Sequence, residues 1–182
     1  MLRIISGIYR SRKIMEPDLK ITILTTDKVR EAIFSSLQFK INDKSCLDLF
    51  SGSGAMSIES ISRGAKISYA IEKNRNIYHT LVSNITSLNI KEKILTFNTD
   101  ALLIQIENNQ KQFDFIFLDA PFNEYDLVNN TLLKIYNKQT LNQDGEIILE
   151  TNNVSKIIIP DGLKIYKQKR YGKIDILYIC YE

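Results

Sequence analysis

A glycine-containing loop that follows a short apolar strand is the clearest chemical signal in the sequence. Residues 47–54 read Leu-Asp-Leu-Phe-Ser-Gly-Ser-Gly, which places Asp48 in the strand and Gly52 and Gly54 in the loop. Glycines let the backbone bend tightly and approach a ligand, and open parallel sheets bind ligands at the carboxyl ends of their strands. The alternative is a tight turn that binds nothing. We interpret the loop as one side of a small-molecule site that carries a carboxylate.

The acidic residues around this loop favour a cationic ligand over a pyrophosphate. A dinucleotide-binding loop has a third glycine where this chain has Ser57, although Glu72, 20 positions after Gly52, matches the acid of such sites. Asp48 would repel a pyrophosphate, whereas it would attract the α-amino group and the sulfonium of S-adenosylmethionine. The sequence therefore predicts S-adenosylmethionine as the cofactor. An NAD-dependent oxidoreductase is the alternative from another enzyme class.

Two further acids are expected to contact this cofactor. An ionised carboxylate offers two acceptor oxygens, so Glu72 could accept both ribose hydroxyls; the alternative is a charge at a helix N-terminus. Asp100, which follows the next strand, is placed to accept from the adenine amine, or else to cap a helix. The candidate cofactor-binding residues are Asp48, Phe50, Gly52, Ser53, Gly54, Glu72, Lys73, Asp100, Ala101 and Asp119.

A second motif, Asp119-Ala120-Pro121-Phe122, ends an almost continuously apolar strand. An acid in this position is costly unless it is paired or lies at the exposed end of the sheet. Pro121 favours an extended Ala120, so the turn can direct carbonyl oxygens and the Asp119 carboxylate into one crevice beside the Phe122 ring. Acceptors next to a ring suit a planar base with an exocyclic amine. The alternative is a turn with Phe122 in the core.

The rest of the chain alternates short apolar runs with amphipathic segments, which predicts an α/β fold. Strands are expected at 46–50, 67–71, 93–97, 113–118 and 146–150, and helices at 55–62, 77–88, 101–106 and 127–136. Strands at 163–169 and 173–181 are so close in sequence that they must be antiparallel. Two short strands within residues 2–14 and a helix that starts near Thr25, Thr26 or Asp27 come first.

This pattern predicts a doubly wound, mostly parallel, Rossmann-like sheet of seven strands that is closed by an antiparallel C-terminal hairpin. We expect one domain over residues 1–182. Within it, residues 1–40 form a small extension of hairpin and helix, and residues 44–182 form the catalytic core.

The composition excludes several protein classes. Apolar residues make up 44% and charged residues 25% of the 182 positions, which is unlike collagen, coiled coils or fully disordered chains. No apolar run approaches the ~18–20 residues that span a bilayer, and the N-terminus lacks a signal-peptide core, so we expect a cytoplasmic protein without membrane contact. Cys46 and Cys180 form no Cys-x-x-Cys pair and His79 is the single histidine, so no metal site is expected.

Basic residues gather at both ends of the chain, although the net charge is only +3. Residues 1–13 and 164–173 carry several lysines and arginines and no acid. Such segments suggest a polyanionic partner; the alternative is a pair of solvated strands whose lysines only aid solubility. The candidate residues for contact with such a partner are Arg3, Arg10, Arg12, Lys13 and Arg30.

These motifs, in this order, resemble the class I S-adenosylmethionine-dependent methyltransferases, and more closely the bacterial family that methylates a guanine N2 amine of 16S ribosomal RNA. The resemblance covers nearly the whole chain. The glycine loop is typical of the superfamily, whereas the Thr-Thr-Asp-Lys-Val-Arg-Glu run at 25–31 and the basic arm at 3–13 narrow it to the family.

The resemblance implies S-adenosylmethionine as the cofactor and 16S rRNA as the partner, either as free RNA or within an assembling small ribosomal subunit. It also implies catalysis by Asp119, Ala120, Pro121 and Phe122 on a guanine turned out of its stack. We expect a monomer.

Two positions depart from the family pattern. Ala120 stands where the family usually has proline, and Ser11 where it usually has glycine. Ala120 leaves a non-catalytic RNA-binding protein as one alternative. Adenine-N6 methyltransferases of DNA or RNA share the order of acid, proline and aromatic residue, so such an enzyme is another alternative.

Overall fold

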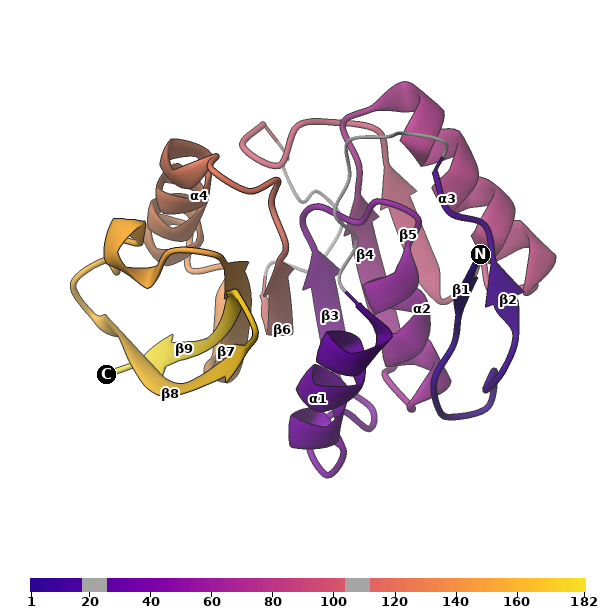
Figure 1. The fold of residues 1–182 in the computed structure, drawn as a ribbon, viewed down its shortest axis with the longest axis horizontal. Coiled ribbons are helices and arrows are strands. Elements are labelled where there is room, and N and C mark those ends of the chain that lie inside the picture. Colours follow the sequence, from indigo (N-terminus) through magenta and orange to yellow (C-terminus); the bar gives the residue numbers. More distant parts are fainter. Residues whose placement is uncertain (18–25, 104–111) are drawn as a thin grey trace.

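A seven-stranded sheet forms the centre of the protein (Figure 1) in a computed structural model that describes residues 1–17, 26–103 and 112–182. The spatial order of the strands is β5-β4-β3-β6-β7-β9-β8. The first five of these are parallel and the last two are antiparallel, as the sequence predicts. The strand bounds are β3 Ser45–Asp48, β4 Ile67–Ile71, β5 Ile94–Phe97, β6 Phe113–Leu118, β7 Leu141–Thr151, β8 Leu163–Tyr171 and β9 Ile174–Tyr181.

Helices cover both faces of the sheet. One face carries α1 (Asp27–Leu37), α2 (Ala55–Ser62) and α3 (Arg75–Ser87), and the other carries α4 (Tyr125–Asn137) (Figure 1). Neighbouring residues of β6 enter different layers: Phe117 packs under α1, and Ile116 packs in the layer that contains α4. Burial on both faces explains why this strand is almost continuously apolar.

The strand order reverses between β3 and β6. The chain runs from β3 to β4 and β5 on one side, and then returns to β6 and β7 on the other. Asp48, the last residue of β3, lies opposite Phe117 of β6. The loops that follow these two strands therefore meet at the position where open α/β sheets bind their ligands.

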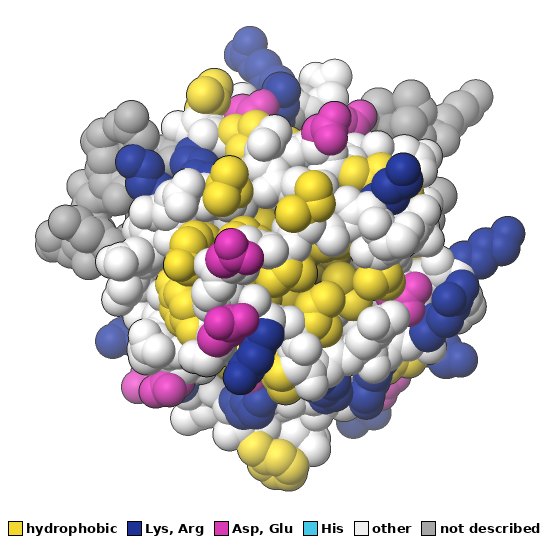
Figure 2. Space-filling view, turned by 90° about the vertical axis from the view of Figure 1, so that its left-hand side faces the viewer, with side chains coloured by type: hydrophobic (Ala, Val, Ile, Leu, Met, Phe, Trp, Pro, Cys, Tyr) yellow, Lys and Arg dark blue, Asp and Glu magenta, His cyan; other side chains and the backbone are white. Residues whose placement is uncertain are grey.

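The C-terminal hairpin places β9 inside the sheet and β8 at its edge. The central residues of β9 are buried, whereas most of β8 is exposed. Figure 2 looks onto this side of the molecule and shows apolar side chains gathered on it, with basic side chains along their lower border. The exposed apolar residues include Leu133 of α4, Ile158, which follows the short 3-10 helix η1 (Val154–Lys156), and Tyr166 of β8.

The N-terminal hairpin of β1 (Leu2–Arg3) and β2 (Lys13–Ile14) packs on the layer of α1, α2 and α3. Ile4 and Ile14 are buried in the same core as these helices. The bend at Gly7 has a φ of 83°, and a Cβ atom there would lie 1.8 Å from the carbonyl oxygen of Ser62 at the end of α2. The hairpin thus rests directly on α2 through a position that only glycine fits.

Most of the predicted elements are confirmed, and two predictions fall on the limits of the described residues. Thr26 caps α1 by accepting from the Val29 amide at 3.3 Å, while Thr25 lies outside the described residues. The predicted helix at 101–106 is not observed at residues 101–103, which form a turn, and residues 104–106 lie outside the described part.

Candidate active site

The glycine loop joins the end of β3 to the start of α2. Gly52 and Gly54 have φ values of 54° and 87°, in the left-handed region that glycine tolerates. The Gly52 amide donates to Glu72 Oε2 at 3.1 Å, and the Ser51 amide donates to the Ile71 carbonyl at 2.9 Å. Apart from its chain neighbours, no heavy atom of the described residues lies within 4 Å of a Cβ built on Gly52. With respect to the described part of the chain, the outer side of the loop is therefore open to a ligand.

Asp48 lies beneath this loop and is 1% exposed. Its Oδ2 accepts from the Ser57 hydroxyl at 2.9 Å. Burial raises the pKa of Asp48 to about 7, and the neighbouring carboxylates of Asp119 and Glu72 contribute to this rise by repulsion. A cation bound nearby would favour the ionised form of this buried carboxyl group.

Glu72 and Asp100 stand at the ends of the next two strands. Burial raises the pKa of Glu72, whose Oε1 accepts from the Asn74 amide at 2.7 Å. Lys73 pairs with Asp100 Oδ2 at 2.7 Å, and the Leu102 amide donates to Asp100 Oδ1 at 2.9 Å. These two donors lower the pKa of Asp100. The candidate cofactor residues Asp48, Gly52, Glu72, Lys73 and Asp100 thus form one connected rim.

The second motif lies at the end of β6, next to this rim. Asp119 is partly exposed, Ala120 is buried, Pro121 is exposed and Phe122 is half-buried. Asp119 lies two residues beyond Phe117, the register partner of Asp48, and it is close enough to act on the pKa of Asp48. The structure therefore brings the two predicted motifs together at one edge of the sheet.

Contacts to the segment after β7 brace the turn that follows Phe122. The Tyr125 hydroxyl lies 3.2 Å from Asn123 Oδ1 and 2.8 Å from Asn152 Oδ1. Asn152 Nδ2 also donates to Asn123 Oδ1 at 3.4 Å. This small polar network fixes the loop after β6 relative to the end of β7.

The predicted RNA-binding residues divide into two groups. Arg3, Arg10, Arg12 and Lys13 are exposed on the N-terminal hairpin. Arg30 is different, because it is 1% exposed and its Nη2 donates to the Arg3 carbonyl at 2.6 Å and to Asp27 Oδ1 at 2.8 Å. The expectation that Arg30 contacts RNA is thus corrected: its guanidinium is used inside the fold, where it holds the hairpin.

Sequence reasoning missed three buried polar residues near the site. Glu59 of α2 accepts from the Ile5 and Ser6 amides at 2.8 and 3.0 Å. Asn84 of α3 joins the hairpin to the glycine loop, because its Nδ2 donates to the carbonyls of Met15 and Ser53, both at 2.9 Å. The third, Glu150, lies near the end of β7 and is 7% exposed. For Glu150, the apolar residues 147–149 that precede it are a signal in the sequence. Glu59 and Asn84 stand among serines and threonines, and nothing in the sequence distinguishes them.

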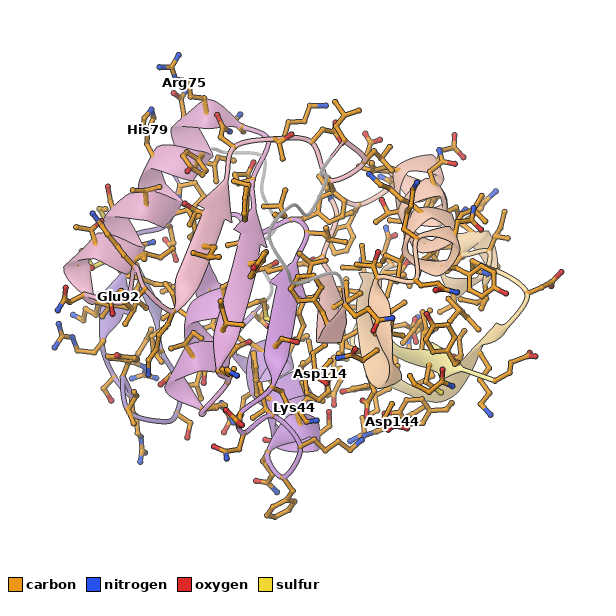
Figure 3. The ribbon with its side chains drawn as sticks, turned by 180° about the vertical axis from the view of Figure 1, so that it is seen from behind. Lys44, Arg75, His79, Glu92, Asp114 and Asp144 are labelled. Carbon is orange, nitrogen blue, oxygen red and sulfur yellow. The ribbon has the colours of Figure 1, made fainter. Side chains whose placement is uncertain are left out.

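Other titratable residues lie away from this edge. His79 and Arg75 point outward from α3, and Lys44 and Asp114 lie together at the amino-terminal edge of the sheet (Figure 3). Burial raises the pKa of the Cys46 thiol to about 12. Within the described ranges, no group of His, Cys, Asp and Glu has a metal-binding arrangement, and no helix is long and apolar enough to cross a membrane.

The sheet is open and mostly parallel, and its candidate site lies where the strand order reverses, as in other ligand-binding α/β proteins. The relatives and solved structures below place this fold among the class I methyltransferases. A scan of protein-family models matches residues 2–180 to the family described as "Conserved hypothetical protein 95". The chain belongs to this family. It is 36% identical over 179 residues to ribosomal RNA small subunit methyltransferase D of Buchnera aphidicola from Acyrthosiphon pisum, covering 97% of this chain and 92% of the relative. The Escherichia coli K12 protein of the same name is 30% identical, with 95% and 86% covered.

Solved structures agree with this assignment. The putative methyltransferase yhhF from Escherichia coli has a TM-score of 0.86 at 29% identity, covering 100% of this chain and 98% of that chain. The putative methylase HI0767 from Haemophilus influenzae has a TM-score of 0.82 at 29% identity, covering 100% and 99%. The predicted fold and its methyltransferase class are confirmed.

Proposed function

We propose that this protein methylates the exocyclic N2 amine of a guanine in 16S ribosomal RNA, with S-adenosylmethionine as the methyl donor. The observation that carries the proposal is the meeting of two motifs at one edge of the sheet: the loop over Asp48 and Glu72, and the turn that starts at Asp119. The names of the relatives point to ribosomal RNA of the small subunit.

The residues present fit this cofactor. S-adenosylmethionine, when bound, supplies a methyl group on a positively charged sulfur. Asp48, Glu72 and Asp119 make the edge of the sheet anionic, and the open side of Gly52 leaves room beside the loop. A pyrophosphate would be repelled by the same carboxylates, which is why an NAD-dependent oxidoreductase is not favoured.

Asp119 and Ala120 act on the base. A guanine N2 amine is a poor nucleophile because its lone pair is conjugated with the ring. The Asp119 carboxylate and the Ala120 carbonyl accept its two N–H bonds, so that the lone pair turns out of the ring plane. Phe122 stacks on the base and holds it outside the RNA stack. Positioning and fixed acceptors supply most of the rate, and Asp119 is also a local acceptor for the proton that the nitrogen loses.

The exposed basic hairpin binds the RNA backbone in this proposal. Arg3, Arg10, Arg12 and Lys13 are all exposed and lie on a hairpin that is fixed to the catalytic layer. Contacts to phosphates position a nucleic acid without reading its sequence. The substrate is 16S rRNA in an assembling small subunit, and the enzyme works as a cytoplasmic monomer.

Methyl transfer to unmodified RNA tests this function. Tritiated S-adenosylmethionine is offered with small ribosomal subunits, naked 16S rRNA or DNA. The wild type and the control Asp126→Asn, an exposed position of α4, should label ribosomal RNA. Asp119→Asn should lose at least about 100-fold in rate. It should still be stabilised by S-adenosylmethionine, because Asp48 and Glu72 remain to bind it. Labelling of DNA alone, stabilisation by NAD instead, or an unimpaired Asp119→Asn would refute the proposal.

A further inference from the structure

Glu150 is a buried acid at the same edge of the sheet that the mechanism above leaves without a role. It is 7% exposed and follows Leu149, whose register partner in β6 is Leu118. Asp119 and Glu150 are therefore the next residues on two neighbouring parallel strands, and alternation along the strands puts both on the face covered by α1 and α2.

Two small hollows flank the turn of residues 119–122, and Glu150 lines both of them. Ile33 of α1, Met56 of α2 and Asp119 share the first hollow with it. Phe122 and Asn123 share the second. The contacts of Tyr125 and Asn152 hold the two strand ends at a fixed separation. Glu150 thus lines a hollow that Asp119 also lines, and it lies on the side of β6 away from β3 and the glycine loop.

We infer that Glu150 is the residue that selects guanine, an inference that rests on the proposed function. Guanine presents donors at both N1 and N2, whereas N1 of adenine or 2,6-diaminopurine is an acceptor. An ionised carboxylate can only accept. With Asp119 and the Ala120 carbonyl on the N2 amine, Glu150 accepts the N1–H. A base with a lone pair at N1 would instead face the negative charge of Glu150.

The discriminating substrate is an RNA whose target guanine is replaced by 2,6-diaminopurine. This base keeps the N2 amine that takes the methyl group and reverses the hydrogen-bonding character of N1. The wild type should prefer guanine by at least about 100-fold in kcat/KM, because a site built to accept a hydrogen bond rejects an analogue without the donor. Glu150→Gln offers an amide N–H to N1, so it should narrow this preference by about tenfold or more.

Glu146→Gln is the matched control. Glu146 lies in the middle of the same strand, four residues before Glu150 and on the same face. It is also 7% exposed, and it pairs with Lys40 and Tyr166. It should keep the wild-type preference, and both variants should keep stabilisation by S-adenosylmethionine. A purely structural role for Glu150 would lower activity on both RNAs equally and leave their ratio unchanged.

Each outcome has one meaning. A narrowed ratio in Glu150→Gln alone supports the inference. An unchanged ratio in a folded Glu150→Gln refutes it and leaves the proposed function intact. Equal use of the two RNAs by the wild type refutes it without any variant, even if Glu150→Gln does not fold. Absence of methyl transfer by the wild type to either RNA refutes the proposed function, and the inference with it.

Discussion

Gly7→Ala should detach the N-terminal hairpin from α2. The added Cβ would lie 1.8 Å from the Ser62 carbonyl oxygen, 2.3 Å from its carbon and 2.6 Å from its hydroxyl. Ordinary contacts are about 3.5 Å, and a backbone carbonyl at a helix end cannot swing away. The hairpin must therefore move by about 1.5 Å.

That movement breaks three hydrogen bonds to Ser62. The Ile8 amide donates to the Ser62 carbonyl at 2.9 Å, the Tyr9 amide donates to the Ser62 hydroxyl at 3.0 Å, and this hydroxyl donates to the Ser6 carbonyl at 2.5 Å. Each contributes about 0.5–1.5 kcal/mol, and the left-handed φ of 83° adds strain of about 1–2 kcal/mol for alanine. We expect a loss of about 2.5–6.5 kcal/mol in the free energy of unfolding, or about 5–25 °C in Tm.

Gly172→Ala separates the two causes. Gly172 has a similar φ of 63°, but among the described residues no heavy atom beyond its chain neighbours lies within 4 Å of a Cβ at that position. Gly172→Ala should lose only the backbone strain of about 1–2 kcal/mol. Urea and thermal unfolding of both variants measure the difference directly. An equal loss in the two proteins would refute the close contact between the hairpin and α2.

Four further predictions concern the site and the arm. Asp48 is expected to bind the cofactor only when ionised, so the affinity for S-adenosylmethionine should rise as the pH increases through about 7; calorimetric titration should show this rise in the wild type and a flat profile in Asp48→Asn. Without the cofactor, the buried Asp48 has the opposite effect on stability. Because its pKa is higher in the folded than in the unfolded protein, the free energy of unfolding of the wild type should fall relative to Asp48→Asn as the pH rises from about 4 to 7. Equal pH profiles of unfolding for the two proteins would contradict this. Ser11 adopts a φ of 66°, so Ser11→Gly should raise the free energy of unfolding by about 0.5–1 kcal/mol after the entropy of glycine is counted, and denaturant titration would contradict this if the variant were less stable. Joint replacement of Arg10, Arg12 and Lys13 by glutamine should reduce the slope of log K against log salt by up to about 0.7–0.9 for each phosphate that is no longer neutralised; an unchanged slope in filter binding would support a solubility role.

The sequence predicts the parallel part of the fold well, because periodicity and burial coincide there. The run at 113–118 is apolar on both faces and forms the centre of the sheet, and the 55–62 helix ends before Arg63 and Gly64 as expected. In the C-terminal hairpin, the short connection determines that the two strands pair but not which one lies inside. Apolar content decides this: β8 carries several lysines and lies at the edge, whereas the more apolar β9 takes the inner place.

The site is predictable where chemistry depends on neighbours in sequence, and not where it depends on contacts across the fold. The glycine loop and the turn at Asp119 are local motifs whose positions follow from strand ends. Arg30 reads as a surface cation in a helix, yet it is buried by the hairpin that folds over it. Glu150 belongs to no sequence motif. It comes close to the turn at Asp119 only because β7 pairs with β6 in the folded protein.

Asn84 of α3 binds both the segment that follows the N-terminal hairpin and the glycine loop. Its side chain accepts from the Met15 amide at 2.8 Å, and its Nδ2 donates to the carbonyls of Met15 and Ser53. The basic hairpin is therefore not a portable module. A graft of residues 1–17 onto another methyltransferase core would lack the side-chain amide of Asn84. It would carry the basic residues, but their distance from the glycine loop would no longer be fixed.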